Sequence, residues 1–138
     1  MGLQVEILEQ SFAAVAPQAD RLVDVFYQHL FEDYPAVKPL FEHAEMAEQK
    51  KKLIAALTLV VENLRRPDVL GPALEQMGSR HVDYGAQEAH YPAVGATLLK
   101  SLAEVAGDAW TSEMNDAWAE AYGEISRIML NGALAHAS

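Results

Sequence analysis

The spacing of apolar residues along the chain is helical almost throughout, with apolar side chains recurring every three or four positions. This pattern occurs in six segments, whose inner faces begin at Val5, Leu22, Leu53, Leu74, Val94 and Met114. Pro17 ends the first segment and Pro35 the second, since neither proline can continue a helix. The sequence contains no alternating strand pattern, internal repeat or low-complexity linker. It therefore predicts an all-α protein with six substantial helices.

Individual residues predict where the helices begin and end. The stretch 34–41 carries prolines four residues apart and is expected to form a tight corner rather than a long helix. Capping residues, prolines and glycines predict the other boundaries. They place a start at Asp20, an end near Arg66-Pro67, a start at Gly71-Pro72, an end at Gly85, Pro92 in a first turn, and a cap at Thr111 or Ser112.

Composition narrows the class of protein further. A length of 138 residues with 51% hydrophobic content is sufficient for one core, so residues 1–138 are expected to form a single domain. The absence of cysteine excludes disulfides, thiolate ligands and covalent cofactor attachment through sulfur. A net charge of −10 disfavours nucleic acid and anionic membranes as partners. The chain shows no secretory signal and no membrane-length apolar run, so we expect a cytoplasmic protein.

His81 is the polar residue that most needs an explanation. It lies on the same predicted helix face as Leu74, Met77, Gly78 and Tyr84. A buried imidazole needs a partner for its ring nitrogens, and a metal ion is one such partner. The five histidines of the chain show no zinc-binding spacing. A structural role in the core is the alternative for His81.

Three further residues interrupt or border the apolar faces. Tyr27 lies one turn from Leu30, Gln49 lies four residues before Leu53, and Phe41 follows the proline-rich corner. Taken singly, Tyr27 and Phe41 also fit the core, and Gln49 also fits a solvated helix start. Their occurrence together with His81 in one helical chain favours a shared site.

Five motifs in this order carry a family resemblance that covers roughly residues 8–131. They are Tyr27 followed by Pro35, Pro39 and Phe41; Gln49-x-x-x-Leu53; Gly78-Ser79-Arg80-His81-x-x-Tyr84-Gly85; His90-Tyr91-Pro92-x-Val94-Gly95; and Ala117-Trp118-x-x-Ala121-Tyr122-Gly123. The chain thus resembles the globin family, specifically the single-domain bacterial haemoglobins of the flavohaemoglobin-related branch. The resemblance implies a globin fold, a 3-on-3 helical sandwich with six main helices and short corner helices.

The resemblance also implies a cofactor and roles for the residues around it. The cofactor would be haem b, with His81 as the iron ligand. On the opposite side Tyr27 and Gln49 would donate hydrogen bonds to a bound diatomic ligand, which implies slow oxygen release and high affinity. Arg80 would pair with a haem propionate, a solvated arginine being the alternative. The remaining cofactor-binding residues would be Phe41, Leu53, Met77, Tyr91, Val94, Leu98 and Tyr122.

The chain departs from this branch at one position beside the ligand histidine. Relatives support that histidine with a tyrosine and a glutamate, which make it more electron-rich. Tyr91 matches the tyrosine, but counting from Tyr122-Gly123 places Ala133 where the glutamate would stand. Glu124 lies too near Tyr122 to be an obvious substitute. We therefore expect a less electron-rich histidine here.

Several functions remain compatible with these features. The first is a haem protein that reversibly binds O2 and also takes NO or CO. The alternative is a nitric oxide dioxygenase that depends on a separate reductase, with weak peroxidase activity in the same class. The chain ends at Ser138 with neither a reductase nor an effector region, which disfavours a self-sufficient enzyme and a sensor. Both monomer and homodimer remain open.

Overall fold

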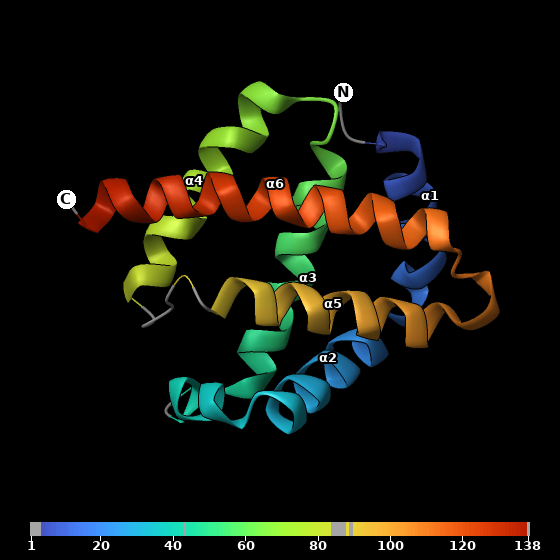
Figure 1. Ribbon diagram of the computed structural model, residues 1–138, viewed down its shortest axis with the longest axis horizontal. Helices are drawn as coiled ribbons and strands as arrows, with labels where there is room; N and C mark the ends of the chain where they lie inside the picture. Colours follow the sequence, from blue (N-terminus) through green and yellow to red (C-terminus); the bar gives the residue numbers. More distant parts are fainter. Residues whose placement is uncertain (1–3, 43, 84–87, 89, 138) are drawn as a thin grey trace.

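A computed structural model describes residues 4–42, 44–83, 88 and 90–137. The six α-helices are α1 (Val5–Val15), α2 (Ala19–Asp33), α3 (Met46–Glu62), α4 (Pro67–Asp83), α5 (His90–Ala106) and α6 (Ser112–Ala137), joined in part by the 3-10 helices η1 (Ala16–Gln18), η2 (Pro35–Phe41) and η3 (Gly107–Ala109). The described residues include no strand (Figure 1). The predicted all-α fold with six helices is confirmed.

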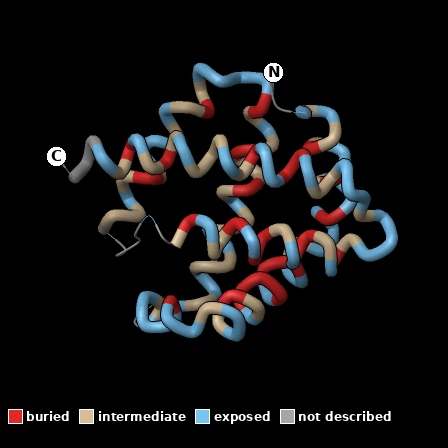
Figure 2. The backbone as a smooth tube through the Cα atoms, viewed as in Figure 1, coloured by how far each residue is buried: buried red, intermediate tan, exposed pale blue. Residues whose placement is uncertain are grey.

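The helices form two crossed layers. α5 and α6 run across the front of the view in Figure 1, and α3 and α4 lie behind them at a steep angle. The most extensive helix contacts join α4 to α6 and α2 to α5. Figure 2 shows buried residues concentrated on the inward sides of the helices, in particular along α2. This inward face is the predicted apolar stripe, since Leu22, Phe26 and Leu30 are all buried.

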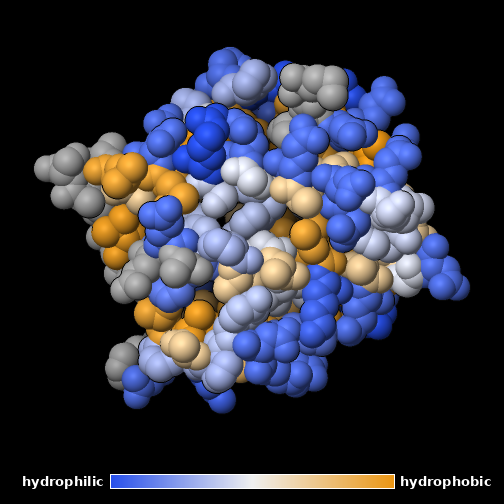
Figure 3. All heavy atoms as spheres, in the orientation of Figure 1, coloured by the Kyte–Doolittle hydropathy of each residue, from blue (hydrophilic) through white to orange (hydrophobic). Residues whose placement is uncertain are grey.

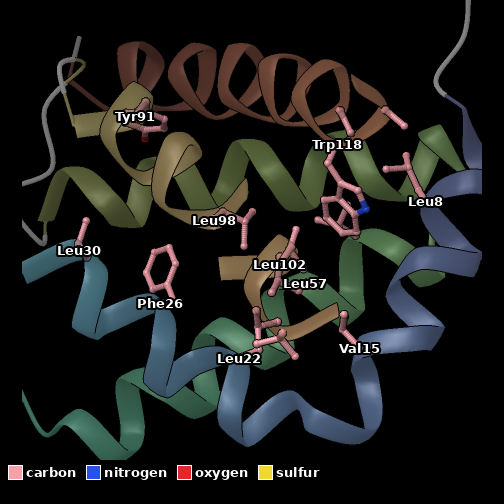
Figure 4. Packing of buried hydrophobic residues seen from close by; sticks show 14 of the residues in the cluster. Leu8, Val15, Leu22, Phe26, Leu30, Leu57, Tyr91, Leu98, Leu102 and Trp118 are labelled. Carbon is pink, nitrogen blue, oxygen red and sulfur yellow. The ribbon is translucent and has the colours of Figure 1, made fainter. Parts of the chain in front are cut away.

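The core centres on α5 and the first half of α6. Trp118 is 2% exposed, and its indole Nε1 donates a hydrogen bond to the Ser11 hydroxyl at 2.7 Å. The Ser11 hydroxyl in turn donates a hydrogen bond to the Ile7 carbonyl. Both the buried hydroxyl and the buried indole N–H therefore have a hydrogen-bond partner. Figure 4 shows Trp118 and Leu8 at one end of this core, with Leu102 and Leu98 leading towards Phe26. All six α-helices contribute buried residues to this one apolar cluster.

Two glycines allow α4 and α6 to cross closely. A Cβ added at Gly78 would lie 1.9 Å from the Met129 carbonyl oxygen. A Cβ added at Gly132 would lie 2.0 Å from the Glu75 carbonyl oxygen. Each helix therefore contributes one glycine at the point where the backbone of the other helix passes. This crossing fixes the position of α4 at Gly78, three residues before His81.

Two predicted helix boundaries are wrong. α4 begins at Pro67 and not at Gly71-Pro72, because a proline at the first helical position loses no hydrogen bond. Pro72 is accommodated inside α4, and Gly71 before it has no Cβ to clash with the proline ring. α3 ends at Glu62, before the predicted Arg66-Pro67, and the Asn63 side chain donates to the Leu59 carbonyl at 2.8 Å. The predicted end at Gly85 lies outside the described residues.

Of the two predicted capping residues of the last helix, Thr111 is the one that caps α6. Its hydroxyl accepts a hydrogen bond from the Met114 backbone N–H at 3.1 Å, which makes Thr111 the residue before the first turn of α6. The stretch 34–41 contains no long helix, as its two prolines predict, and residues Pro35–Phe41 form a short 3-10 helix. η2 carries Phe41 at its end and so determines where that ring stands.

The face of the molecule that Figure 3 shows is mainly polar, as the acidic composition leads us to expect. In Figure 3 hydrophilic side chains cover most of the visible face, and apolar side chains gather at the end of the molecule where α6 finishes. Leu134 on α6 is 69% exposed and belongs to that end. Among the described residues, none of the helices combines the length and apolar character needed to cross a bilayer.

Candidate functional site

Tyr27 stands in a group of aromatic rings on the inner face of α2. Its side chain is buried, with 8% of its surface exposed. The ring centroid of Phe26 lies 5.1 Å away at an interplanar angle of 87°, and that of Phe41 lies 5.8 Å away at 75°. Phe31, one helical turn further along α2, lies at 6.0 Å. The structure thus brings together Tyr27 and Phe41, two of the residues expected to line one pocket.

The Tyr27 hydroxyl points towards the start of α3. It donates a hydrogen bond to the Gln49 backbone carbonyl over 3.4 Å, a distance at the long end of the normal range. Burial raises the pKa of Tyr27 to about 12. A phenol is protonated at neutral pH even at its ordinary pKa of about 10, and burial extends this donor state to higher pH. Gln49 is half-buried in the first turn of α3, so Tyr27 and Gln49 lie on adjoining elements as expected.

His81 is half-buried near the end of α4. Its Nδ1 lies 2.7 Å from the Met77 carbonyl oxygen, one helical turn earlier. A carbonyl can only accept, so Nδ1 carries the proton and donates this bond. In the neutral ring the lone pair is then on Nε2, which is the nitrogen suited to bind a metal.

A second pair of tyrosines joins α5 to α6. The Tyr122 hydroxyl donates to the Tyr91 backbone carbonyl at 2.7 Å. Gly95 makes room for this contact, because a Cβ there would lie 2.6 Å from the Tyr122 ring. Burial raises the pKa of both phenols. The Tyr91 hydroxyl is buried and has no hydrogen-bond partner among the described residues.

The other predicted cofactor-binding residues occupy the same elements. Leu53, Met77 and Val94 are half-buried and pack against the core, and Leu98 is fully buried in it. Arg80 is exposed beside His81, a placement compatible with a propionate partner or with a solvated side chain.

Ala133 is half-buried in the last turns of α6, and α6 is continuous from Ser112 to Ala137. No break in the helix therefore shifts the position that was assigned to the glutamate by counting from Tyr122. Glu124 does not replace the missing glutamate, because its carboxylate pairs with Arg127 on the helix exterior.

Sequence reasoning missed the part played by Phe31. This ring is half-buried and lies 5.4 Å from Phe41 as well as near Tyr27. Its spacing of four residues from Tyr27 is the sequence signal that was available. A surface groove of about 520 Å³ between η2 and the start of α5 was also missed. The groove is lined by Asp33, Tyr34, Pro35, Ala36, Val37, His90, Pro92 and Ala93, and by none of the predicted cofactor-binding residues.

These residues fit a haem group. The Nδ1 bond to the Met77 carbonyl holds the His81 ring in the tautomer that an axial iron ligand needs. The group on α2 and η2 supplies apolar aromatic surface together with one buried, neutral donor. An apolar wall with few polar groups is the usual construction of a cofactor site.

Comparison with known proteins defines the family. The Globin family model matches residues 24–129, a span that contains Tyr27, Phe41, His81 and Tyr122. The chain belongs to the globin family, and haem binding is supported for it at that level.

The chain is also similar to particular bacterial proteins. It is 35% identical over 128 residues to a flavohemoprotein of Rhodopirellula baltica and 32% identical over 126 residues to one of Rhizobium meliloti, covering 91% and 90% of this chain but 31% of each relative. The chain therefore spans about a third of the length of these curated relatives.

Two solved structures share its fold along nearly the whole length. A bacterial globin from Campylobacter jejuni has a TM-score of 0.81 and 29% identity, covering 94% of both chains. An engineered carbene transferase, made from a Rhodothermus marinus protein designated a nitric oxide dioxygenase, has a TM-score of 0.84 and 28% identity, covering 96% of this chain and 93% of its own. The chain is thus a globin related to flavohaemoglobins.

Proposed function

We propose that this globin binds haem b through His81 and reversibly holds O2, with NO and CO as further ligands. The observation that carries the proposal is the buried Tyr27 phenol, a neutral hydrogen-bond donor set among aromatic rings. A core tyrosine without such a role would be expected to satisfy its hydroxyl with a short hydrogen bond. The Tyr27 hydroxyl instead makes one long bond, of 3.4 Å, and so can be redirected towards a ligand.

Haem, when bound, supplies an iron atom with one coordination position open to a diatomic ligand. His81 would be the residue that holds the iron, through its Nε2 lone pair. The Met77 carbonyl fixes the orientation of the imidazole ring by accepting the Nδ1 proton. It also makes the ring a better electron donor than an imidazole without such a bond.

Tyr27 and Gln49 act on the ligand side. A fixed donor in an apolar site would stabilise partial negative charge on a diatomic ligand more than water does. Tyr27 supplies an O–H that remains protonated at neutral pH, and the Gln49 amide can donate to the same ligand or to Tyr27. Leu53 on the same helix as Gln49 restricts access to the pocket. Together these residues favour slow oxygen release.

Replacing Tyr27 with phenylalanine is expected to speed oxygen release by about tenfold or more, because a hydrogen bond to a partially charged ligand is lost. The aromatic packing is retained in this variant, so the fold stays intact. Stopped-flow measurement of O2 dissociation from the haem-loaded protein tests this. CO dissociation is the internal control, since CO carries little charge and depends less on the donor. An unchanged O2 rate would remove Tyr27 from this role.

The second candidate is a nitric oxide dioxygenase, favoured by the similarity to flavohemoproteins and to the Rhodothermus marinus protein. In this reaction NO and O2 combine to give nitrate when one electron is supplied. A separate flavin reductase using a nicotinamide cofactor would provide that electron. The Tyr27 donor would stabilise the negative charge that builds up on oxygen in this reaction too. Steady-state NO consumption with an added reductase separates this enzyme from a simple carrier.

Ala133 provides a test of how far the proximal side limits such turnover. The family resemblance assigns a glutamate to this position and pairs it with the tyrosine that Tyr91 matches. We expect Ala133→Glu to make His81 more electron-donating and to raise reductase-driven NO consumption severalfold. Raman measurement of the iron–histidine stretch should show a shift to higher frequency.

Ala133→Gln is the matched control for this substitution. It has nearly the same size but carries no negative charge, so it cannot draw a proton away from an imidazole to the same degree. A shift of equal size in both variants would contradict the electrostatic explanation.

A further inference from the structure

We propose that Phe31 is a positioning residue that aims the Tyr27 hydroxyl at the ligand. This inference rests on the proposed function only in that the hydroxyl is taken to meet a haem ligand. Its structural basis is a triangle of rings formed by Tyr27, Phe31 and Phe41. The centroid distances are 6.0 Å for Tyr27–Phe31, 5.8 Å for Tyr27–Phe41 and 5.4 Å for Phe31–Phe41.

The Tyr27 hydrogen bond is too weak to orient the side chain by itself. Its length of 3.4 Å is well beyond the 2.7–2.8 Å that is usual for a hydroxyl donor. The ring orientation must therefore come chiefly from packing. The described ring contacts of Tyr27 are with Phe26, Phe31 and Phe41.

Phe31 differs from the other two rings in what it connects. Phe26 is the neighbour of Tyr27 in the chain, so it turns with the same stretch of α2. Phe31 lies one turn later, at i+4, and its ring meets the tyrosine ring at an interplanar angle of 37°. It also contacts Phe41 of η2 at an interplanar angle of 64°. Phe31 thus ties the tyrosine to the corner that carries the other ring of the pocket.

Position 31 allows this role to be tested without loss of the fold. Phe31 is half-buried, whereas Phe26 is 3% exposed and part of the central cluster. Leucine retains much of the apolar volume of Phe31 but removes the flat edge that contacts both rings. Phe31→Leu should therefore loosen the Tyr27 ring and leave the core in place.

A double-mutant cycle decides whether Phe31 acts through the Tyr27 hydroxyl. O2 dissociation is measured on haem-loaded wild type, Phe31→Leu, Tyr27→Phe and the double variant. We expect Phe31→Leu to raise the rate roughly three- to tenfold in the wild type, and to add nothing when the hydroxyl is already absent. Equal effects of Phe31→Leu in the two backgrounds, or no effect in the wild type, would overturn the proposal.

Phe12→Leu serves as the matched control. Phe12 is also a half-buried ring with one tilted aromatic neighbour, Trp118 at 6.4 Å, but it lies on α1 away from Tyr27. We expect the O2 dissociation rate of this variant to equal that of the wild type. An effect as large as that of Phe31→Leu would show that any loosened ring alters the rate, and would also overturn the proposal.

A second measurement does not depend on oxygen binding. The flip rate of the Tyr27 ring, followed by NMR with labelled tyrosine on the protein as purified, should rise severalfold in Phe31→Leu and stay unchanged in Phe12→Leu. If Tyr27→Phe leaves oxygen release unaltered, the proposed ligand role of the hydroxyl fails, and a faster ring flip still supports positioning by Phe31. An unchanged flip rate would contradict the inference about Phe31 alone.

Discussion

The His81→Ala variant is expected to purify with little or no haem. His81 is the histidine whose Nδ1 is already bonded to a helix carbonyl, at 2.7 Å, in the arrangement that an axial ligand requires. Loss of a ligand that binds the metal directly should cost more than the ten- to hundredfold that is typical of residues behind a ligand. We therefore expect haem affinity to fall by more than about hundredfold. The haem-to-protein absorbance ratio and the rate of haem transfer to a scavenger apoprotein measure this loss.

His29→Ala is the matched control for this experiment. His29 is a helical histidine with a side-chain partner, Glu104, whose carboxylate oxygen lies 2.8 Å from its Nε2. Because Glu104 engages its Nε2, His29 is not expected to bind the iron, and its loss should leave haem content unchanged. A His81→Gly variant given free imidazole should recover haem, because the small ring can enter the space left by the side chain. Retention of haem by His81→Ala at the wild-type ratio would refute the assignment of the ligand.

Much of the fold could be predicted from the sequence because each helix carries its own apolar stripe. The spacing of four residues between Leu22, Phe26 and Leu30 predicts one face of a helix, and all three are buried in α2. The corner at 35–41 followed from two prolines whose rings exclude a long helix. Such local rules apply within one element, and they do not state which elements meet.

The features that could not be predicted depend on contacts between distant segments. Gly71-Pro72 resembles a helix start locally, yet α4 already begins at Pro67 and continues through the proline. The bond from Tyr122 to the Tyr91 carbonyl needs the space above Gly95, and only the packing of α5 on α6 reveals it. The motifs placed both tyrosines at one site, but the sequence does not state how they touch.

In the candidate site, too, some features follow from the sequence and others only from contacts between distant segments. The residue types at Tyr27, Gln49, Phe41 and His81 were sufficient to propose a haem pocket by resemblance to globins. The sequence indicates only that the ring nitrogens of His81 need partners, and the structure identifies the Met77 carbonyl as one of them. The contribution of Phe31 emerged only when its distances to two other rings were known.

The crossing of α4 and α6 supplies the second large effect that we expect. In Gly78→Ala the added methyl group would lie 1.9 Å from the Met129 carbonyl oxygen, far inside van der Waals contact. Backbone atoms cannot move aside as the end of a side chain can, so the two helices must separate. We expect the free energy of unfolding to fall by about 3 kcal/mol, at the upper end of the usual cost of overpacking. Urea unfolding followed by circular dichroism measures the loss.

Gly123→Ala is the control, because a Cβ at this exposed position in α6 would meet nothing within 4 Å. Alanine is the better helix former, so this variant should gain roughly 0.5–1 kcal/mol. The opposite signs separate a clash at the crossing from a general effect of replacing glycine in a helix. Equal stability of Gly78→Ala and wild type would contradict the close approach of the two helices.

The same substitution should also reach the haem site. Gly78 lies three residues before His81 on α4, so a displacement of that turn moves the imidazole and the Met77 carbonyl with it. We expect Gly78→Ala to release haem faster than wild type under conditions where both are folded, whereas Gly123→Ala releases it at the wild-type rate. Gly78 would then be needed to position His81 although it contacts no ligand itself. The reason is that packing against α6 sets the position of α4, which carries both residues.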